Sequence, residues 1–509
     1  MTTPKALIWS LLSVLTCVLL AGCAAVKPDQ EYHMVAQHVA EATGQKSTYR
    51  PDEEDAVQSR VEALLVDGLT ISEAIQLALL SNPAFQAAWM DVGMARADLV
   101  QSGLLSNPSL GGSLRFPAGG GLADLEVTMA QNVADLWQIP IRQRAAQSAL
   151  DQVILRLARR AAELAADTRA AYVRAAGARE LHNVAVDNLA IARQLLDMTV
   201  GRQQAGAGSE LDVNLSRSAV LEAELSVESA RLAASEARRG LVQLLGLTTD
   251  PERIALSESL PSSVPGLPPA EALIAIAREK RLDVRAAVQA VAQADARVRE
   301  EYLKVFPTLE LGMAMERAQR QAQPGRSVLA DAARASIVNG ALTAPEIQPR
   351  SDRRQNTDFI IGPSWGLELP VFDQNQAQIA KAQYARQQVE KTLQAVSQRM
   401  EQEVRSASDQ TATAWRIVAA YRERFIPLAE KSLALSRESY NAGRASFLSV
   451  LESQRFFLET RRRAIEAQQT AAAAIPEVER AVGLPLVDLS SDYPSTRPAT
   501  GKPAVGDKP

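Results

Sequence analysis

The chain has 509 residues, of which 47% are hydrophobic but only 4% aromatic, and its formal net charge is −4. A slightly acidic chain without a basic stripe excludes nucleic acid as the expected partner. Much of its apolar content is alanine, which suits narrow helical packing better than a thick globular core. The only cysteines, Cys17 and Cys23, lie near the start, so no disulfide framework or cysteine metal site is expected downstream.

The N-terminus has the pattern of a targeting segment, residues 1–22. Lys5 precedes an apolar run that is too short for a transmembrane helix. The run ends in Leu-Ala-Gly before Cys23, which resembles a bacterial lipobox and predicts cleavage there and acylation, as by palmitate, of the Cys23 thiol. The alternative is an ordinary secretory signal with a coincidental cysteine. Ala24, in place of an acidic residue, favours sorting to the outer membrane.

The polar stretch that follows, residues 23–68, is expected to be an extended, lipidated leader. His33 and His38 within it could share a helix face, and the third histidine, His182, is remote. Without a cluster of carboxylates or thiols around them, a metal site here is a weak hypothesis, and no cofactor is predicted.

The next segment, residues 69–250, is predicted to be helical around a single β-hairpin. Thr70 or Ser72 can cap the first helix, with Glu73 as its first-turn acid. Strict alternation of apolar and polar residues over 109–131 predicts the hairpin. A proline-free pattern of three-to-four-residue spacing then predicts two long helices joined by a turn at 205–213.

That turn has a near copy 237 positions later, which indicates a tandem duplication. AGAGSELDV at 205–213 matches AGRASFLSV at 442–450, and in each a helix-stopping glycine precedes a serine N-cap candidate. The same position in two similar halves predicts that both helical tips lie together in space.

The second half repeats this order over residues 269–486, after a Pro/Ser-rich linker at 251–268. Its β-hairpin is expected over 308–370, with a long polar loop at 317–358 that is either functional or disordered. Pro427 is expected to kink the second pair of long helices. The tail from 487 to 509 is predicted to be disordered.

Two hairpins with one apolar face each cannot close a barrel alone, but several chains could share one in a lipid bilayer. Four strands from each of three chains would give twelve. Phe359 and Trp365 could then form an aromatic belt at the membrane surface. The alternative is a soluble β-hairpin packed on helices.

These features together resemble the TolC-like outer-membrane efflux factors. The matching pieces are the lipobox, the duplicated order of elements, QSGLLSNPSL at 101–110, LELPVFD at 367–373 and YNAGRAS at 440–446. The first of these runs is most similar to the heavy-metal-efflux branch. The resemblance implies a mainly α-helical chain that forms a homotrimer, with a twelve-stranded transmembrane β-barrel above a periplasmic α-helical tunnel.

Such a duct is passive and works without a cofactor, between outer-membrane lipid, a periplasmic adaptor and an inner-membrane efflux pump. The resemblance places both helical tips at the periplasmic mouth, where the adaptor docks. Four residues would shape these tips: Gly206, Ser209, Gly443 and Ser446. Asp212 and Tyr440 match positions that hold the aperture closed through polar bonds. Arg444 lies next to the position of a gating arginine, where this chain has Ala445.

The resemblance also implies a constricting acidic ring, from which this chain departs. Ser449 occupies the first of its two positions and Glu452 the second, so three chains would supply three carboxylates instead of six. We therefore expect a weaker cation-attracting field at the mouth. The pump, and not the duct, would select the cargo, which the sequence does not reveal.

No pattern in the sequence indicates an enzyme, because catalytic triads and phosphate loops are both missing. Two alternatives remain. One is a lipid-anchored periplasmic coiled-coil scaffold without a pore. The other is the adaptor itself, which would need lipoyl-like and barrel domains with many short strands. Trimeric pores in a lipid bilayer would favour the duct over both.

Overall fold

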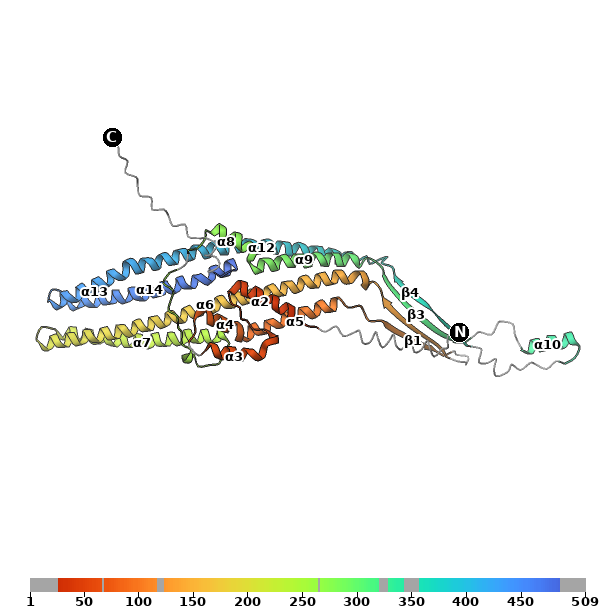
Figure 1. Cartoon of the computed structure of the whole chain (residues 1–509), viewed down its shortest axis with the longest axis horizontal. Helices are drawn as coiled ribbons and strands as arrows, with labels where there is room; N and C mark the ends of the chain where they lie inside the picture. Colours follow the sequence, from red (N-terminus) through yellow and green to blue (C-terminus); the bar gives the residue numbers. More distant parts are fainter. Residues whose placement is uncertain are drawn as a thin grey trace, which may run out of the picture. The chain divides into compact units, whose positions relative to one another are not determined.

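The computed structural model describes residues 26–65, 68–116, 123–263, 266–319, 328–342 and 357–485 (Figure 1). They form long helices and one antiparallel sheet, as the sequence predicts. The described residues divide into two compact units. The first unit takes those within 1–98, 148–291 and 388–509, and the second takes those within 99–147 and 292–387. Both helical tips belong to the first unit and the sheet belongs to the second.

The described part of the leader is helical, so the expectation of an extended segment is wrong. Its elements are α2 (Asp29–Thr43), η1 (Pro51–Glu53) and α3 (Glu54–Leu64). Along α2, Tyr32, Val35 and Val39 are buried at helical spacing. The Tyr32 ring meets that of Trp89 edge-on, with centroids 5.7 Å apart. This packing stabilises a short helix whose polar composition hid its apolar side. Cys23 and the targeting segment lie outside the described residues.

The helices of the first repeat are α4 (Ile71–Ser81), α5 (Pro83–Ser102), α6 (Asp135–Gln204) and α7 (Glu210–Leu245). Of the two candidate caps, Thr70 starts α4, in a capping box: the Thr70 hydroxyl accepts the Glu73 N–H at 3.2 Å, and the Glu73 carboxylate accepts the Thr70 N–H at 2.9 Å. These bonds hold the pKa of Glu73 below its usual range. α6 begins before Pro140, earlier than expected, because a proline so near the helix start removes little of the hydrogen-bond ladder.

The helices of the second repeat are α8 (Ala270–Lys280), α9 (Leu282–Leu303), α12 (Gln376–Ala420), α13 (Ile426–Asn441) and α14 (Phe447–Val482). Between α12 and α13 lies η3, a π-helical turn over Tyr421–Phe425. Pro427 follows directly and has no N–H to donate, so a local change of helix type accommodates the missing bond. The long loop expected over 317–358 contains a further helix, α10 (Val328–Asn339).

Both repeats join their short and long helices in the same way. In the first, the Asn82 side-chain amide donates to the carbonyl of Leu244 at the end of α7, at 2.9 Å. In the second, the buried Arg281 guanidinium donates to the carbonyl of Ala481 at the end of α14, at 3.1 Å. Each bond satisfies a carbonyl that the helix end leaves free. The sequence duplication is therefore also a duplication of packing.

The sheet contains β1 (Ser109–Arg115), β2 (Asp124–Asn132), β3 (Thr308–Gln319) and β4 (Thr357–Glu368), adjacent in that order and all antiparallel. The two predicted hairpins thus combine into one sheet through β2 and β3. Gly312 sits where a Cβ would lie 2.1 Å from the Met129 carbonyl oxygen, so this contact requires glycine. β1 and β4 each leave one edge unpaired among the described residues.

The strand register puts the apolar side chains on one face of the sheet. Leu110 faces Met129, Met129 faces Met313, and Leu311 faces Trp365. These side chains are exposed in the single chain, with Leu110 and Trp365 each about three-quarters accessible (77% and 74%). Elsewhere, none of the described helices combines the length and hydropathy of a membrane-spanning segment.

Candidate functional site

The two helical tips have the same backbone. Gly206 and Gly443 both adopt left-handed conformations, with φ of 72° and 69°. In each tip the next N–H reaches back five residues to a helical carbonyl, from Ala207 at 2.9 Å and from Arg444 at 2.8 Å. This is the Schellman motif, which needs a residue without a Cβ penalty at the glycine position. The duplicated glycines are therefore explained by backbone geometry.

The hydroxyl groups that clasp the hairpins are also repeated. Thr199 of α6 donates to Ser216 of α7 at 3.0 Å. At the equivalent positions, 237 residues on, Ser436 of α13 and Ser453 of α14 are 2.6 Å apart. Both pairs lie between the two helices of one hairpin, close to its tip. They hold the hairpins in the same register in both repeats.

The N-caps differ between the tips. Ser209 caps α7, because its hydroxyl accepts the N–H of Asp212 at 3.1 Å. Ser446 precedes α14 in the same extended conformation, but its side chain makes no capping bond. Its carbonyl instead accepts from the N–H and the hydroxyl of Ser449, at 3.1 Å and 2.7 Å. Of the two predicted serine caps, only Ser209 is one.

Arg202 joins one tip to the other. Its guanidinium donates to the Tyr440 carbonyl at 2.9 Å and to the Asn441 carbonyl at 3.4 Å, both at the end of α13. It also lies over the Tyr440 ring, 4.5 Å from the centroid, and donates to Ala207 in its own tip. A cation at a helix C-terminus is favoured by the free carbonyls and the helix dipole. The prediction that the two tips lie together is confirmed.

Tyr440 is buried in this junction. Its ring packs edge-on against Phe447, with centroids 5.5 Å apart, and its hydroxyl has no hydrogen-bond partner within the described residues. Burial raises the pKa of Tyr440, and the nearby Asp212 carboxylate raises it further, against the opposing effect of Arg202. Tyr440 is therefore a neutral phenol at any physiological pH. A buried hydroxyl without a partner is costly.

The remaining candidate residues lie apart from this junction. The Arg444 side chain is exposed, and no ion pair is recorded for it among the described residues. Glu452 is exposed too, and its nearest cation is Arg455 on its own helix, at 3.8 Å. Within one chain, then, the expected group of Asp212, Tyr440, Arg444 and Glu452 is not a connected cluster. The structure brings only Asp212 and Tyr440 near each other.

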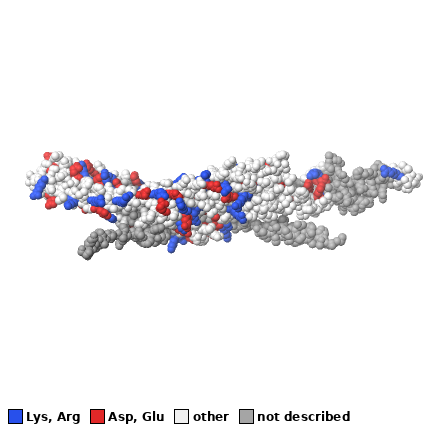
Figure 2. All heavy atoms as spheres, turned by 90° about the horizontal axis from the view of Figure 1, so that it is seen from above, with Lys and Arg blue, Asp and Glu red and all other residues white. Residues whose placement is uncertain are grey.

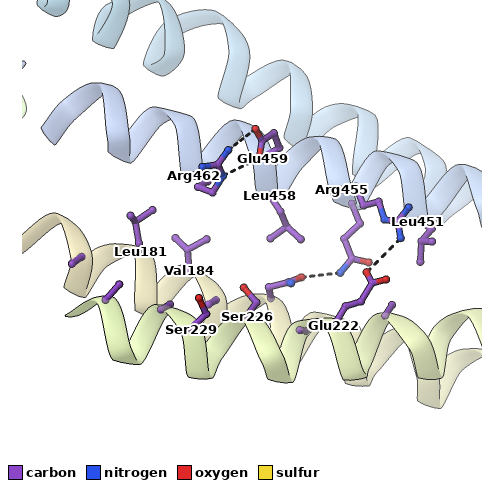
Figure 3. Close-up of a pocket in the computed structure, with 18 residues that line it drawn as sticks. Leu181, Val184, Glu222, Ser226, Ser229, Leu451, Arg455, Leu458, Glu459 and Arg462 are labelled. Carbon is purple, nitrogen blue, oxygen red and sulfur yellow. Dashed lines mark hydrogen bonds and ion pairs between the residues drawn. The ribbon is translucent and has the colours of Figure 1, made fainter. Parts of the chain in front are cut away.

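A groove of about 650 Å³ runs between the two hairpins beyond the tips (Figure 3). Two polar contacts cross it: Arg455 of α14 lies 3.4 Å from Glu222 of α7, and Gln454 donates to Asn188 of α6 at 3.1 Å. α7 contributes a row of small side chains, which are Ala219, Ala223, Ser226, Ser229, Ala230 and Ala233. These keep the helices close while leaving the groove open to solvent.

The described residues contain no cluster of metal ligands, and the face in Figure 2 has no basic stripe. Within the described residues, no three side chains of His, Cys, Asp or Glu are grouped to hold a metal ion. His33 lies 3.4 Å from the Arg50 guanidinium, which disfavours a cation there. Figure 2 shows acidic and basic side chains interspersed along the face in view, without the single-sign stripe that nucleic acid requires.

Sequence reasoning missed Arg202. Its position does carry a signal, because a basic residue in the last turn before a C-terminal glycine suits the helix dipole. The equivalent residue in the second repeat is Ser439, so Arg202 also breaks the internal symmetry. What the sequence could not give is its partner. That partner is the backbone of α13, a set of carbonyls without side-chain identity.

Similar folds are known among outer-membrane channels. A membrane protein from Pseudomonas aeruginosa matches with a TM-score of 0.63 at 18% identity, over 83% of this chain and 93% of that one. The open state of the Neisseria gonorrhoeae MtrE outer membrane channel matches with a TM-score of 0.61 at 18% identity, over 82% and 89%. The duplicated hairpins and the sheet thus have the fold of an outer-membrane channel protomer.

Comparison of the sequence identifies the protein family of the chain. The outer membrane efflux protein family matches residues 74–247 and 273–484, and the chain belongs to that family. Protein CyaE of Bordetella pertussis is 29% identical over 294 residues, which span 55% of this chain and 60% of CyaE. The aligned part is thus less than two thirds of that relative. Members of this family are transport ducts, not enzymes.

Proposed function

We propose that this protein is the outer-membrane exit duct of a tripartite efflux system, which passively conducts substrates from an inner-membrane pump and a periplasmic adaptor to the outside. The observation that carries this proposal is the sheet. Its apolar side chains, such as Leu110, Met313 and Trp365, are exposed on one face. Its outer strands also leave two free edges. A lone sheet of this kind is an aggregation hazard in water, whereas a closed barrel in lipid uses both features.

Closure requires further copies of the chain. The sheet is an up-and-down meander of four strands, so β4 of one copy can pair antiparallel with β1 of the next. Three copies give a twelve-stranded barrel, in which Phe359 and Trp365 belong to the lipid-facing surface. The helical repeats of the three copies then form the periplasmic tunnel. Acylation of Cys23, after removal of residues 1–22, would add a lipid anchor.

The tips form the periplasmic mouth in this proposal. Gly206, Ser209, Gly443 and Ser446 shape the surface on which a helical adaptor docks, and the shared Schellman geometry gives six similar tips per trimer. Asp212 and Tyr440 contribute to holding the aperture closed, with Arg444, Ser449 and Glu452 at its rim. The exposed Arg444 side chain is available to a neighbouring copy.

The test is planar-bilayer recording with the purified full-length protein. We expect trimers, seen by native mass spectrometry, and discrete pores of low resting conductance. Asp212→Ala and Tyr440→Phe should each raise the resting conductance, because each removes a polar group at the mouth. A monomer that gives no current, with the wild type and with both variants, would show instead a lipid-anchored coiled-coil scaffold without a pore.

A further inference from the structure

The face of the sheet opposite the apolar one is strongly acidic. Among the strand residues whose side chains the structure describes, this face carries five carboxylates and one guanidinium, that of Arg115. The carboxylates belong to Asp124, Glu126, Glu310, Glu316 and Glu368. Arg317 lies on the other face, where it pairs with Leu125 and Phe359. The described side chains of one chain therefore contribute five negative charges and one positive charge to this face.

The carboxylates lie in two tiers along the strands. In the tier at the end of β1 and the start of β2, Glu126 stands directly opposite Glu316. Arg115 donates to Glu126 at 2.8 Å, whereas no ion pair is recorded for Glu316 within the described residues. Like charges directly opposite each other destabilise a sheet. The sheet thus retains a like-charge contact on a face that must be solvated.

The second tier lies near the helices. Glu310 pairs with Gly366, so nothing covers its carboxylate from the next strand. Glu368 accepts only the hydroxyl of Thr308, at 3.1 Å. Neither glutamate has an ion pair among the described residues. The neighbours on this face are small, such as Gly312, Ser364 and Gly366, and the Glu310 carboxylate lies over Gly366.

We infer that the barrel wall, and not the helical tips, makes this duct favour cationic over anionic solutes. The inference rests on the proposed duct, because only closure with the apolar face toward lipid turns the acidic face into the lumen. In three copies, the described side chains alone would put fifteen carboxylates and three guanidinium groups there, a net charge of −12. Rings of carboxylates attract cations in channels, and a lumen lined by one sign concentrates the field.

The tips are poorly suited to this role. Glu452 is the single carboxylate left at the expected acidic ring, and it lies 3.8 Å from the cation of Arg455. At the same end of the hairpins, the positive charges of Arg202 and Arg444 offset the carboxylates of Glu210 and Asp212. The charge that selects solutes is therefore placed where the two repeats meet in the sheet.

The experiment measures reversal potentials of single pores under a tenfold KCl gradient, with full-length protein. The test variant combines Glu310→Gln, Glu316→Gln and Glu368→Gln, which keeps side-chain shape and the Thr308 bond while removing three charges per chain. The matched control is Glu452→Gln at the tips. We expect wild-type pores to prefer K⁺ and the triple variant to lower the K⁺/Cl⁻ permeability ratio by at least about threefold. The tip variant should change it by less than about twofold.

The salt dependence of the cation preference gives a second test. The preference should be larger around 10 mM salt, where the Debye length is about 30 Å, than at 1 M, where it is about 3 Å. If the triple variant does not assemble, Glu316→Gln alone serves, because it relieves a like-charge contact and should leave the sheet intact. Pores whose reversal potential these variants leave unchanged, or which respond more to Glu452→Gln, would overturn the inference. Failure to form any pore would count instead against the proposed duct.

Discussion

The two helical tips have the same backbone conformation but carry different kinds of side chain. Both end in a left-handed glycine with Schellman bonding, and both hairpins are clasped by a hydroxyl pair at equivalent positions. Their side chains differ. The first tip supplies Arg202 and Asp212, which are charged, and the second supplies Tyr440 and Phe447, which are aromatic and buried.

This difference separates two roles of the tip residues: folding each hairpin, and joining one hairpin to the other. The glycines and hydroxyl pairs serve the folding of each hairpin and have to be present twice. The contact between hairpins needs a donor on one side and acceptors on the other, so it cannot be symmetric. Arg202 occupies the position where the second repeat has Ser439, and it binds the second repeat's helix end. The junction between the tips thus depends on a position at which the two repeats differ.

The largest effect that the comparison predicts concerns the glycines. Gly246 and Gly483 end the return helices at positive φ, 69° and 88°. An alanine Cβ at Gly246 would lie 2.4 Å from a backbone oxygen, whereas at Gly483 its nearest contact is 3.1 Å. We expect Gly246→Ala to cost roughly 2–5 kcal/mol, from the left-handed backbone plus the steric overlap.

Gly206→Ala and Gly443→Ala are the matched controls, because nothing lies within 4 Å of either Cβ position. They should lose only the backbone term, roughly 1–2 kcal/mol. Gly483→Ala should fall between. Thermal unfolding followed by helical circular dichroism ranks the four. Equal destabilisation at Gly246 and Gly206 would show that the close packing at the repeat base is not rigid.

The next effect tests the junction between the tips. Arg202→Ala removes a charged donor from three carbonyls and one aromatic ring, and should cost about 1–2 kcal/mol locally. Hydrogen exchange at the end of α13 should become faster, and the resting conductance should rise. Arg444→Ala, which removes an exposed arginine from the other tip, is the control for the loss of charge. If Arg444→Ala opens the pore and Arg202→Ala does not, the closing contact lies between chains.

Much of the fold follows from the sequence, and particular residues show why. Alternation around Leu110 and Leu311 predicts strands because side-chain direction has period two. Gly206 and Gly443 predict the tips because few residues tolerate left-handed backbone. The joining of both hairpins into a single sheet depends on β2 meeting β3, a pairing between residues nearly two hundred positions apart. No local pattern specifies such a pairing.

Less of the candidate site than of the fold could be predicted from the sequence. Asp212 and Tyr440 were found through resemblance to a family, and the structure places them near each other without a direct hydrogen bond. Arg202 was missed because its partners are carbonyls, which every residue has. The helical leader was missed because α2 depends on packing against Trp89, and its own composition is polar. Tertiary contacts override weak local preference in such segments.

The N-caps give a smaller test of the same asymmetry. Ser209→Ala removes a hydroxyl that accepts the Asp212 N–H, and should cost about 1 kcal/mol. Ser446→Ala removes a hydroxyl that makes no capping bond, and should cost almost nothing. Hydrogen exchange of the first turns of α7 and α14 measures each cap separately. If the two variants accelerate hydrogen exchange equally in their helices, Ser446 caps α14 in solution. The two tips would then have equivalent N-caps.

The smallest effect concerns Glu222 and Glu459, which occupy equivalent positions of the two repeats and both line the groove. Glu459 of α14 accepts from Arg462 at 2.8 Å and from Arg463 at 2.6 Å, while Glu222 of α7 reaches across to Arg455. Hydrogen bonds from Arg462 and Arg463 lower the pKa of Glu459 from 4.5 to about 2. A depressed carboxylate pKa stabilises the fold above the unfolded value and loses that contribution as the pH falls toward 2. Because these groups are well exposed, we expect Glu459→Gln to cost less than about 1 kcal/mol at pH 7.

The difference in unfolding midpoint between the wild type and Glu459→Gln should therefore be constant from pH 7 to about 5.5 and shrink between pH 4.5 and 2. Salt should shrink it at neutral pH as well, since exposed pairs are screened. A difference that persists at pH 2 would mean that the side chain stabilises α14 by packing in the groove and not by its charge. In that case the groove, which both repeats line, would owe its shape to contacts that the two copies still share.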